Sequence, residues 1–236
     1  MTLSRALIDQ AIRRQNLSSV AIQSDEYYTS YAGRVANVNG VPSLGVLYRS
    51  VTGEAPRRYW ADFVQFLAGY ADMDVEQFIR LHSAFPLNAA FSVGAWSRKV
   101  ADGKIDPLAI RQLATMAPRL KYCVGCAMED VEFWGCSYWR VTHQLHGIEC
   151  CLKHRRRLIV TDWAADIQCS VCPVELMYSD MPTLDRLLFH QSRLQARYGD
   201  VLLGFMDLQG RTKRDDLVSL LNERASLFGV ACAANQ

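Results

Sequence analysis

The sequence predicts a mainly α-helical protein with a small β zinc ribbon near its centre. Two ligand pairs predict the ribbon: Cys123 with Cys126, and Cys151 with His154. Apolar residues at helical spacing on both sides of these pairs predict the helices. We therefore expect an N-terminal helix-turn-helix-like helical domain, followed by a zinc-ribbon domain and C-terminal helices.

These patterns divide the 236-residue chain into four parts. We expect an N-terminal extension over residues 1–25, the helical domain over 26–110, the zinc-ribbon core over 111–180 and a C-terminal helical segment over 181–236. The apolar spacing that ends at Ile12 predicts a helix in the extension, which either covers the core or docks on a partner.

Composition limits the class of protein. The chain is 50% hydrophobic and 21% charged, which is ordinary for a globular protein. Its net charge of +2 is too small to indicate nucleic-acid binding by overall charge alone. Eight cysteines without a signal-peptide pattern favour metal binding in a reducing compartment over disulfides. The apolar runs are too short to cross a bilayer, so we expect a cytoplasmic protein without a membrane partner.

The first helix of the helical domain is expected between Glu26 and Gly40. Ser24 or Asp25 is the candidate N-cap, and Asn39 with Gly40 is the stop signal. One face of this helix is apolar, so it should lie against the core. The residues on that face are Tyr27, Tyr31, Val35 and Val38.

A helix, a turn and a second helix are expected between Trp60 and Ser83, with Asp74 as the cap of the second helix. The exposed positions of the second helix would be Asp74, Glu76, Gln77 and Arg80. Carboxylates at its front would repel phosphates, so protein interaction is favoured over base reading. Arg80 is the position on this helix that would contact nucleic acid.

Two further helical regions are expected. Asp106 is a natural cap for a short helix between the helical domain and the ribbon. Beyond Met181, leucines at helical spacing predict the C-terminal helices, which we expect to cover the ribbon.

Cys123, Cys126, Cys151 and His154 match the tetrahedral ligand set of a structural zinc ion, if one hairpin brings the two pairs together. Four protein ligands leave no position for a water molecule, so this zinc should stabilise the fold and not catalyse. The alternative is a set of unrelated buried cysteines with a surface histidine. A redox role would need a thioredoxin-like strand and helix, which the sequence does not show.

A third pair, Cys169 and Cys172, is a candidate for a second zinc site. Its remaining ligands would come from Cys136, Cys150, His143 or His146, none of which forms a cleanly spaced pair. His143 could instead fix a turn by a backbone hydrogen bond. The sequence therefore leaves open whether the protein binds one zinc ion or two.

A cationic run lies beside the second ligand pair. Eight basic and four acidic residues lie between positions 110 and 160, and the surplus is concentrated at Lys153, Arg155, Arg156 and Arg157. These four are candidate phosphate contacts on DNA or a guide RNA, with a solvated surface as the alternative.

The central segment resembles the zinc-ribbon core of the TniQ/TnsD transposition proteins, with one departure at His146, where the family usually has proline. The opening of the helical domain, from Glu26 through Arg34 to Asn39-Gly40, resembles the start of the same family pattern. The matching central residues are Tyr122, Cys123, Cys126, Glu129-Asp130, Gly135, Tyr138-Trp139-Arg140, His143-Gln144-Leu145, Gly147-Ile148, Cys151 and His154. Arg34 is expected on a solvated helix face.

This resemblance implies a target-selection adaptor in DNA transposition. Such a protein links a target-recognising complex, here a CRISPR effector with its guide RNA, to the AAA+ transposition ATPase (TnsC-like), with target DNA and a homodimer among the expected partners. The near-neutral charge favours this RNA-guided mode because base pairing then supplies the specificity. The alternative is a direct, sequence-specific, zinc-dependent DNA-binding protein, either a TnsD-like target-site reader or a transcriptional regulator. No catalytic motif is present, so we expect no enzyme activity.

Overall fold

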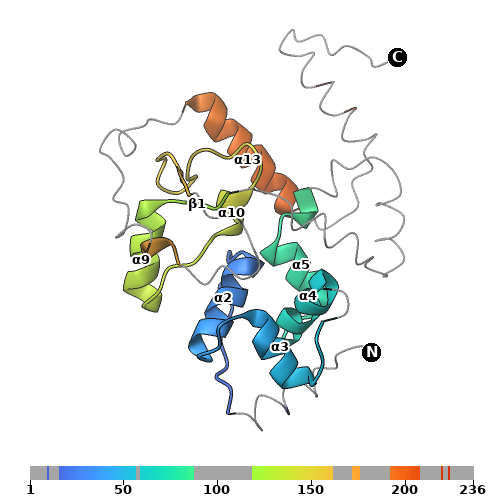
Figure 1. The fold of residues 1–236 in the computed structure, drawn as a ribbon. Coiled ribbons are helices and arrows are strands. Elements are labelled where there is room, and N and C mark those ends of the chain that lie inside the picture. Colours follow the sequence, from blue (N-terminus) through green and yellow to red (C-terminus); the bar gives the residue numbers. More distant parts are fainter. Residues whose placement is uncertain are drawn as a thin grey trace.

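The computed structural model describes residues 16–56, 59–87, 119–161, 172–175 and 192–207, together with the single residues 10, 219 and 223. This part of the chain is mainly helical and carries a small two-stranded sheet, so the predicted fold class is confirmed (Figure 1). The helices are α2 (Tyr28–Val38), α3 (Leu44–Thr52), α4 (Tyr59–Tyr70), α5 (Val75–His82), α9 (Val124–Trp134), α10 (Val141–Gln144) and α13 (Arg193–Asp207). The strands β1 (Lys121–Tyr122) and β2 (Ile159–Val160) pair antiparallel.

Helix α2 begins and packs differently from the sequence prediction. Its N-cap is Tyr27, which makes no side-chain capping bond, so the expected cap at Ser24 or Asp25 is wrong. The Asp25 carboxylate instead accepts hydrogen bonds from Thr142 in α10. The predicted apolar face is buried except for Val38, which is 54% exposed because it lies in the last turn.

The predicted helix-turn-helix is formed by α4 and α5. Asp74 caps α5 as expected, since its Oδ1 atom accepts hydrogen bonds from the backbone of Glu76 at 2.7 Å and Gln77 at 3.5 Å. Helix α3, which the sequence analysis did not predict, is capped by Ser43 and contacts both α2 and α4. The largest fully buried side chains of this helical group are Tyr31, Leu44, Leu47, Phe63, Phe66, Leu67 and Phe78.

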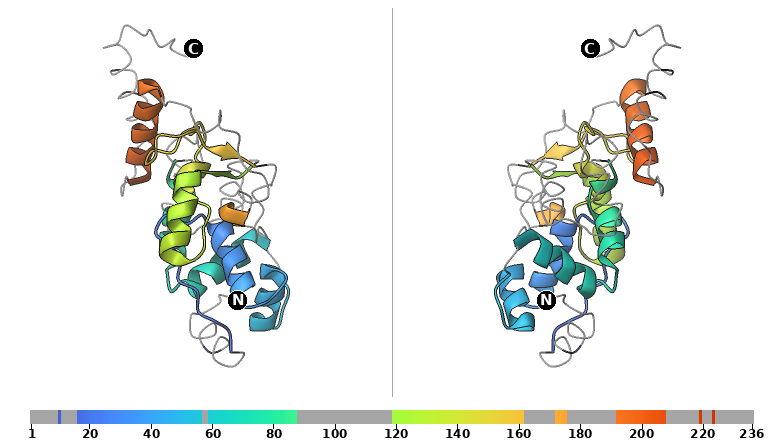
Figure 2. Two further views of the ribbon diagram at one scale, coloured as in Figure 1. Left: turned by 90° about the vertical axis from the view of Figure 1, so that its left-hand side faces the viewer. Right: turned by 90° about the vertical axis from the view of Figure 1, so that its right-hand side faces the viewer.

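The segment between the two ligand pairs is helical. It contains α9 and the single turn α10, so the expected hairpin between the pairs is wrong. The two strands flank the ligand pairs instead, with Tyr122 opposite Ile159. Figure 2 shows α9 on the outer side of the molecule, with the strand pair beyond one of its ends.

The helical group and the strand pair share one continuous buried core. Trp139, which is 1% exposed, connects them through its backbone. Its carbonyl accepts a hydrogen bond from Tyr27 N at 2.7 Å, and its amide donates to Ser30 Oγ at 3.1 Å. A buried tryptophan with both backbone groups bonded to α2 fixes the central segment against the helical group. The proposed division into four parts stays a prediction.

Several sequence predictions fall outside the described residues. These are most of the extension helix ending at Ile12, the short helix capped by Asp106, and Cys169. In the C-terminal segment, α13 is one of the expected helices and lies beside the loop after α10, where the Tyr198 hydroxyl donates to the His146 carbonyl at 3.4 Å (Figure 1). In the described part of the chain, no helix is both long enough and apolar enough to cross a membrane.

Candidate metal centre

Two short turns place the four predicted ligands. Cys123 follows β1 directly and is the N-cap of α9, so Cys126 lies in the first turn of that helix. The second turn closes through hydrogen bonds from Arg155 N to the Cys151 carbonyl and from Cys151 N to the Arg156 carbonyl, both 2.8 Å. Arg155 adopts a left-handed φ of 57°, which reverses the chain after the last ligand.

The ligand atoms have the spacing of a tetrahedral zinc site. The sulfur of Cys126 lies 3.6 Å from that of Cys151 and 3.4 Å from His154 Nδ1. His154 Nδ1 lies 3.6 Å from the Cys123 sulfur and 3.7 Å from the Cys151 sulfur. A tetrahedron with ordinary zinc bond lengths has edges of about 3.6–3.8 Å. All four ligand atoms lie within 4.8 Å of one another. The predicted ligand set is therefore assembled in space.

Burial and sterics fit a closed structural centre. The three cysteines are at most 4% exposed, and His154 is 23% exposed. A Cβ atom at Gly125 would lie 2.9 Å from the His154 ring, so only glycine lets the imidazole approach the first turn of α9 this closely. Three cysteines and one histidine are a standard structural zinc set. These residues would hold the ion, which would tie the start of α9 to the turn after Ile148.

Each thiol of the cluster affects the protonation of its neighbours through hydrogen bonds. Hydrogen bonds from the Cys123 and Cys126 thiols lower the pKa of Cys151, whereas hydrogen bonds with Cys123 and Cys151, together with burial, raise the pKa of Cys126. Because metal ligation needs thiolates at all three cysteines, zinc binding releases protons and strengthens as pH rises.

Two residues contact the ligands from outside. Glu129 Oε1 lies 3.2 Å from His154 Nε2, and its other oxygen accepts from Lys153 Nζ at 2.5 Å. His143, buried at 4%, has its Nε2 atom 3.9 Å from the Cys126 sulfur. The sequence analysis assigned neither role. The role of Glu129 could have been inferred from its position three residues after Cys126, because this spacing places both residues on one side of α9.

Arg140 and Arg34 are half-buried, and each is paired with a buried carboxylate. Arg140 forms ion pairs with Asp130 at 2.5 Å and Asp25 at 3.6 Å. Arg34 donates from Nε and Nη2 to the two oxygens of Glu26, at 2.7 and 2.6 Å, and Glu26 is 0% exposed. The expected solvated role of Arg34 is therefore wrong, because the buried carboxylate needs a cation beside it.

The second zinc site stays a prediction. Cys169 lies outside the described residues, and Cys172 is half-buried. Of its candidate partners, His143 lies against the first centre and His146 is exposed. Within the residues that the structure describes, Cys123, Cys126, Cys151 and His154 form the single group with metal-ligand geometry.

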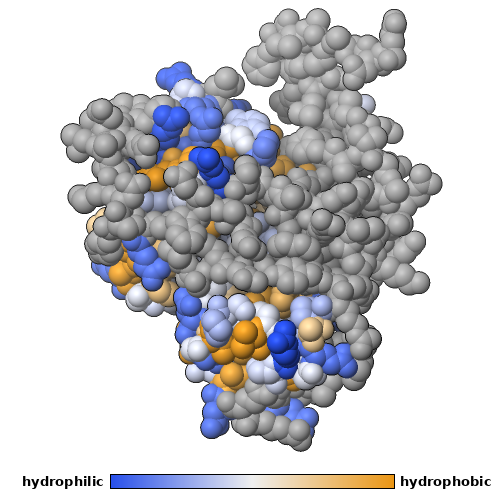
Figure 3. Space-filling model, in the orientation of Figure 1, coloured by the Kyte–Doolittle hydropathy of each residue, from blue (hydrophilic) through white to orange (hydrophobic). Residues whose placement is uncertain are grey.

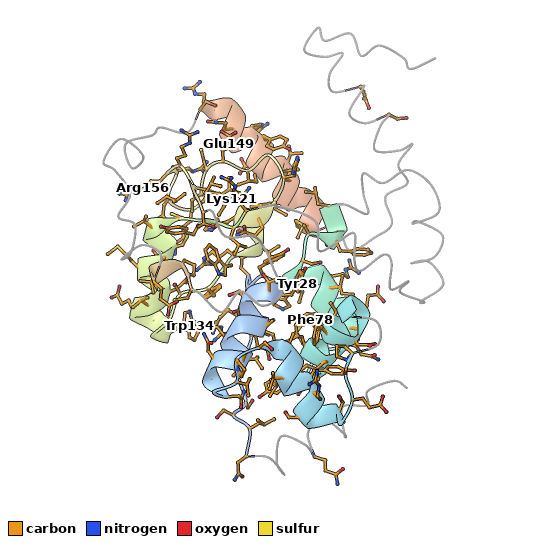
Figure 4. All side chains as sticks on the ribbon, viewed as in Figure 1. Tyr28, Phe78, Lys121, Trp134, Glu149 and Arg156 are labelled. Atoms are coloured by element: carbon orange, nitrogen blue, oxygen red, sulfur yellow. The ribbon has the colours of Figure 1, made fainter. Side chains whose placement is uncertain are left out.

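Four of the five residues predicted to contact nucleic acid are exposed. Lys153, Arg155, Arg156 and Arg157 are all exposed, although Lys153 is paired with Glu129. Figure 4 shows Arg156 toward the left-hand margin of the view. Arg80 lies half-buried near the end of α5. Their contact with nucleic acid stays a prediction.

Comparison with protein families gives a match for this arrangement. The TniQ family model matches residues 17–158, which is more than half of the chain. The chain belongs to the TniQ family. The match spans α2 to α5, the four metal ligands and the turn after them, so it covers most of the shared core, whereas β2 and α13 lie beyond it. A comparison with curated proteins finds no match.

Membership in the TniQ family indicates the general role of the protein. Proteins of this family are transposition adaptors without an enzymatic function of their own, and they act in the selection of the target. Their partners are the transposition machinery and DNA. The resemblance seen in the sequence is thus confirmed at the level of the family.

Proposed function

We propose that this TniQ protein is an adaptor that links a CRISPR effector with its guide RNA to the AAA+ transposition ATPase. The observation that carries the proposal is the TniQ match over a single core that holds both the helical group and the metal centre. A bound metal ion would hold the start of α9 and the second ligand turn in a fixed position within this core. A rigid body with separate surfaces is what an adaptor between two assemblies needs.

Charge supports the RNA-guided mode of targeting. The net charge is only +2, and the exposed first turn of α5 carries Asp74 and Glu76. Phosphates would be repelled there, so α5 is poorly suited to read a DNA groove. Where a guide RNA supplies sequence recognition, the adaptor does not need a basic recognition helix.

Exposed apolar side chains on α9 support a protein-binding role. Phe133 is 79% exposed, and Met128 and Trp134 are each 58% exposed. Large side chains of this kind are enriched in protein interfaces. They are rare on the surfaces of proteins that contact nucleic acid alone, where cations dominate.

Lys153, Arg155, Arg156 and Arg157 form the proposed nucleic-acid surface of the adaptor, with Arg80 as a more distant contact. Lys153 lies between the two ligands of the second pair, and the three arginines follow directly after His154. A bound zinc ion would hold this turn rigid, so their charges would meet phosphates without a large loss of conformational entropy.

Co-purification tests the adaptor role. The tagged protein is expressed with the genes beside its own, and the recovered proteins and RNA are identified by mass spectrometry and sequencing. Recovery of effector subunits, guide RNA and an ATPase supports the proposal. Recovery of bare DNA, or of an ATPase without RNA, would favour the direct DNA-reading alternative.

A matched pair of variants locates the protein contact. Phe133→Ser removes the most exposed apolar side chain of α9, and Val46→Ser removes one that is 43% exposed on α3. The proposal expects loss of a protein partner with Phe133→Ser and full recovery with Val46→Ser. Sedimentation of the purified protein shows whether that partner is a second copy of the chain.

A further inference from the structure

A groove of about 340 Å³ lies beside the metal centre, between the strand pair and the loop after α10. Its walls come from β1, β2 and the chain between α10 and the second ligand pair. None of the four metal ligands lines it. The residues used below are Arg119, Lys121, Arg157, Ile148, Leu158 and Val160.

The groove combines cations with an apolar surface. Arg119 and Arg157 are exposed, Lys121 is half-buried, and Glu149 is the one carboxylate among the lining residues. Ile148, Leu158 and Val160 also line the groove; Ile148 and Leu158 are buried beneath it, whereas Val160 is 54% exposed although it lies in a strand. Figure 4 places Lys121 and Glu149 in the upper part of the molecule, where Figure 3 shows hydrophilic residues next to an apolar strip.

Hydrogen bonds hold the groove in a fixed shape. Lys121 Nζ donates to the carbonyls of Leu145 at 2.9 Å and Ile148 at 2.8 Å. The Gln144 side chain accepts from the Lys121 amide at 2.9 Å and donates to its carbonyl at 2.8 Å, as a neighbouring strand would. A site that is ordered before binding loses less entropy when its ligand arrives.

Tyr198 from α13 packs against the loop that lines the groove. A Cβ atom at Gly147 would lie 2.7 Å from the Tyr198 hydroxyl oxygen, and Gly147 has a positive φ of 75°. Both observations require glycine at this position. The loop that lines the groove is therefore tied to the C-terminal helix as well as to β1.

This combination matches an unpaired nucleotide better than a duplex. A duplex presents phosphates while its bases stay stacked inside, so it gains little from an apolar floor. Single-strand sites place cations along the backbone and apolar or aromatic groups against the bases. A volume of about 340 Å³ lies at the small end of the range for small-ligand pockets, which suits one nucleotide unit.

We propose that this groove binds an unpaired nucleotide of a single strand, with its phosphate against Arg119 and Arg157 and its base or sugar against Val160. The strand is either DNA that has been displaced from a duplex or an unpaired stretch of RNA. This site goes beyond the adaptor role, because binding would occur without an effector or an ATPase.

Fluorescence anisotropy with the full-length, zinc-loaded protein tests the proposal. The probes are labelled oligo(dT) and oligo(rU) of about 12 nucleotides, within the site sizes of single-strand binders. A DNA hairpin with the same number of phosphates is the duplex probe. The proposal expects at least one single strand to bind roughly tenfold more tightly than the hairpin. The ratio between oligo(dT) and oligo(rU) identifies the source of the strand.

Three charge variants complete the test. Arg119→Glu and Val160→Glu place a carboxylate in the groove and should each weaken single-strand binding roughly tenfold. Arg49→Glu makes the same charge change as Arg119→Glu at an exposed site on α3 and should leave binding unchanged. Zinc content and circular dichroism confirm that each variant is folded.

Equal affinity for the hairpin and the single strands would overturn the proposal. Unchanged single-strand binding by both folded groove variants would also overturn it. Neither result would affect the adaptor role, which co-purification tests separately.

Discussion

The carboxylate of Glu129 lies 3.2 Å from Nε2 of His154, on the side of the imidazole opposite the atom that faces the three sulfurs. A proton on Nε2 that is donated to Glu129 leaves the Nδ1 lone pair directed at the sulfurs. Carboxylates in this position orient the ligating histidine and raise its basicity. Glu129 and Cys126 both belong to α9, so one helix supplies a ligand and the support for another.

Glu129→Gln is expected to weaken zinc binding by about 10- to 100-fold, the usual cost of losing a residue that orients a ligand. Competition with a chromogenic chelator measures the affinity. Glu132→Gln is the matched control because Glu132 is exposed on the same helix. Equal zinc affinities for the two variants would show that Glu129 does not support the metal centre.

Gly125→Ala is expected to weaken zinc binding and lower the thermal stability. The new Cβ atom would lie 2.9 Å from the His154 ring and displace the imidazole from the sulfurs. Gly204→Ala in α13 is the control, since no heavy atom lies within 4 Å of the Cβ position there. An alanine inside a helix stabilises by up to about 1 kcal/mol relative to glycine. Calorimetry should therefore give a lower melting temperature for Gly125→Ala and a slightly higher one for Gly204→Ala than for the unchanged protein.

Arg34→Met is expected to destabilise the fold by about 3–5 kcal/mol, because it leaves the Glu26 carboxylate charged and buried without its cation. Urea unfolding measures the change. Arg49→Met removes an exposed arginine from α3 and should change stability by less than about 0.5 kcal/mol. Similar costs for both variants would contradict the structural role of the Arg34–Glu26 pair.

Lys121 is expected to titrate far below an ordinary lysine. Burial lowers its pKa from 10.5 to about 8, with Glu149 opposing the shift. Because the unfolded chain binds this proton more tightly, the contribution of Lys121 to stability increases as pH rises from 8 to 10.5. Competitive amine labelling with mass spectrometry should give a midpoint near pH 8 for Lys121. Lys153, whose pKa is raised by Glu129, should label only at higher pH.

The metal centre could be predicted from the sequence because it rests on local spacing. Two short pairs fix four ligands in two turns, and the structure brings all four together. The Asp74 cap was predictable for the same reason, since an aspartate before an apolar helical pattern acts within one turn. Within each ligand pair, and between Asp74 and the amides that it caps, the partners lie no more than three residues apart in the chain.

Features that depend on distant contacts could not be predicted. Asp25 has the sequence signature of a cap for α2, yet its carboxylate bonds to Thr142. The sequence pattern places Arg34 on a solvated helix face, but in the structure Arg34 is paired with the buried Glu26. The groove joins β1, β2 and the loop after α10, which the expected hairpin would have arranged differently.

Metal analysis of the purified protein tests the central claim most directly. We predict one zinc ion per folded chain from the Cys123, Cys126, Cys151 and His154 centre, and a second only if the Cys169 and Cys172 pair also binds. Cys123→Ser and Cys151→Ser should each lose this zinc and unfold the shared core, because structural zinc contributes on the order of 10 kcal/mol of apparent binding energy. Folded protein with less than one zinc ion per chain, together with unchanged thermal stability in both variants, would contradict the metal centre.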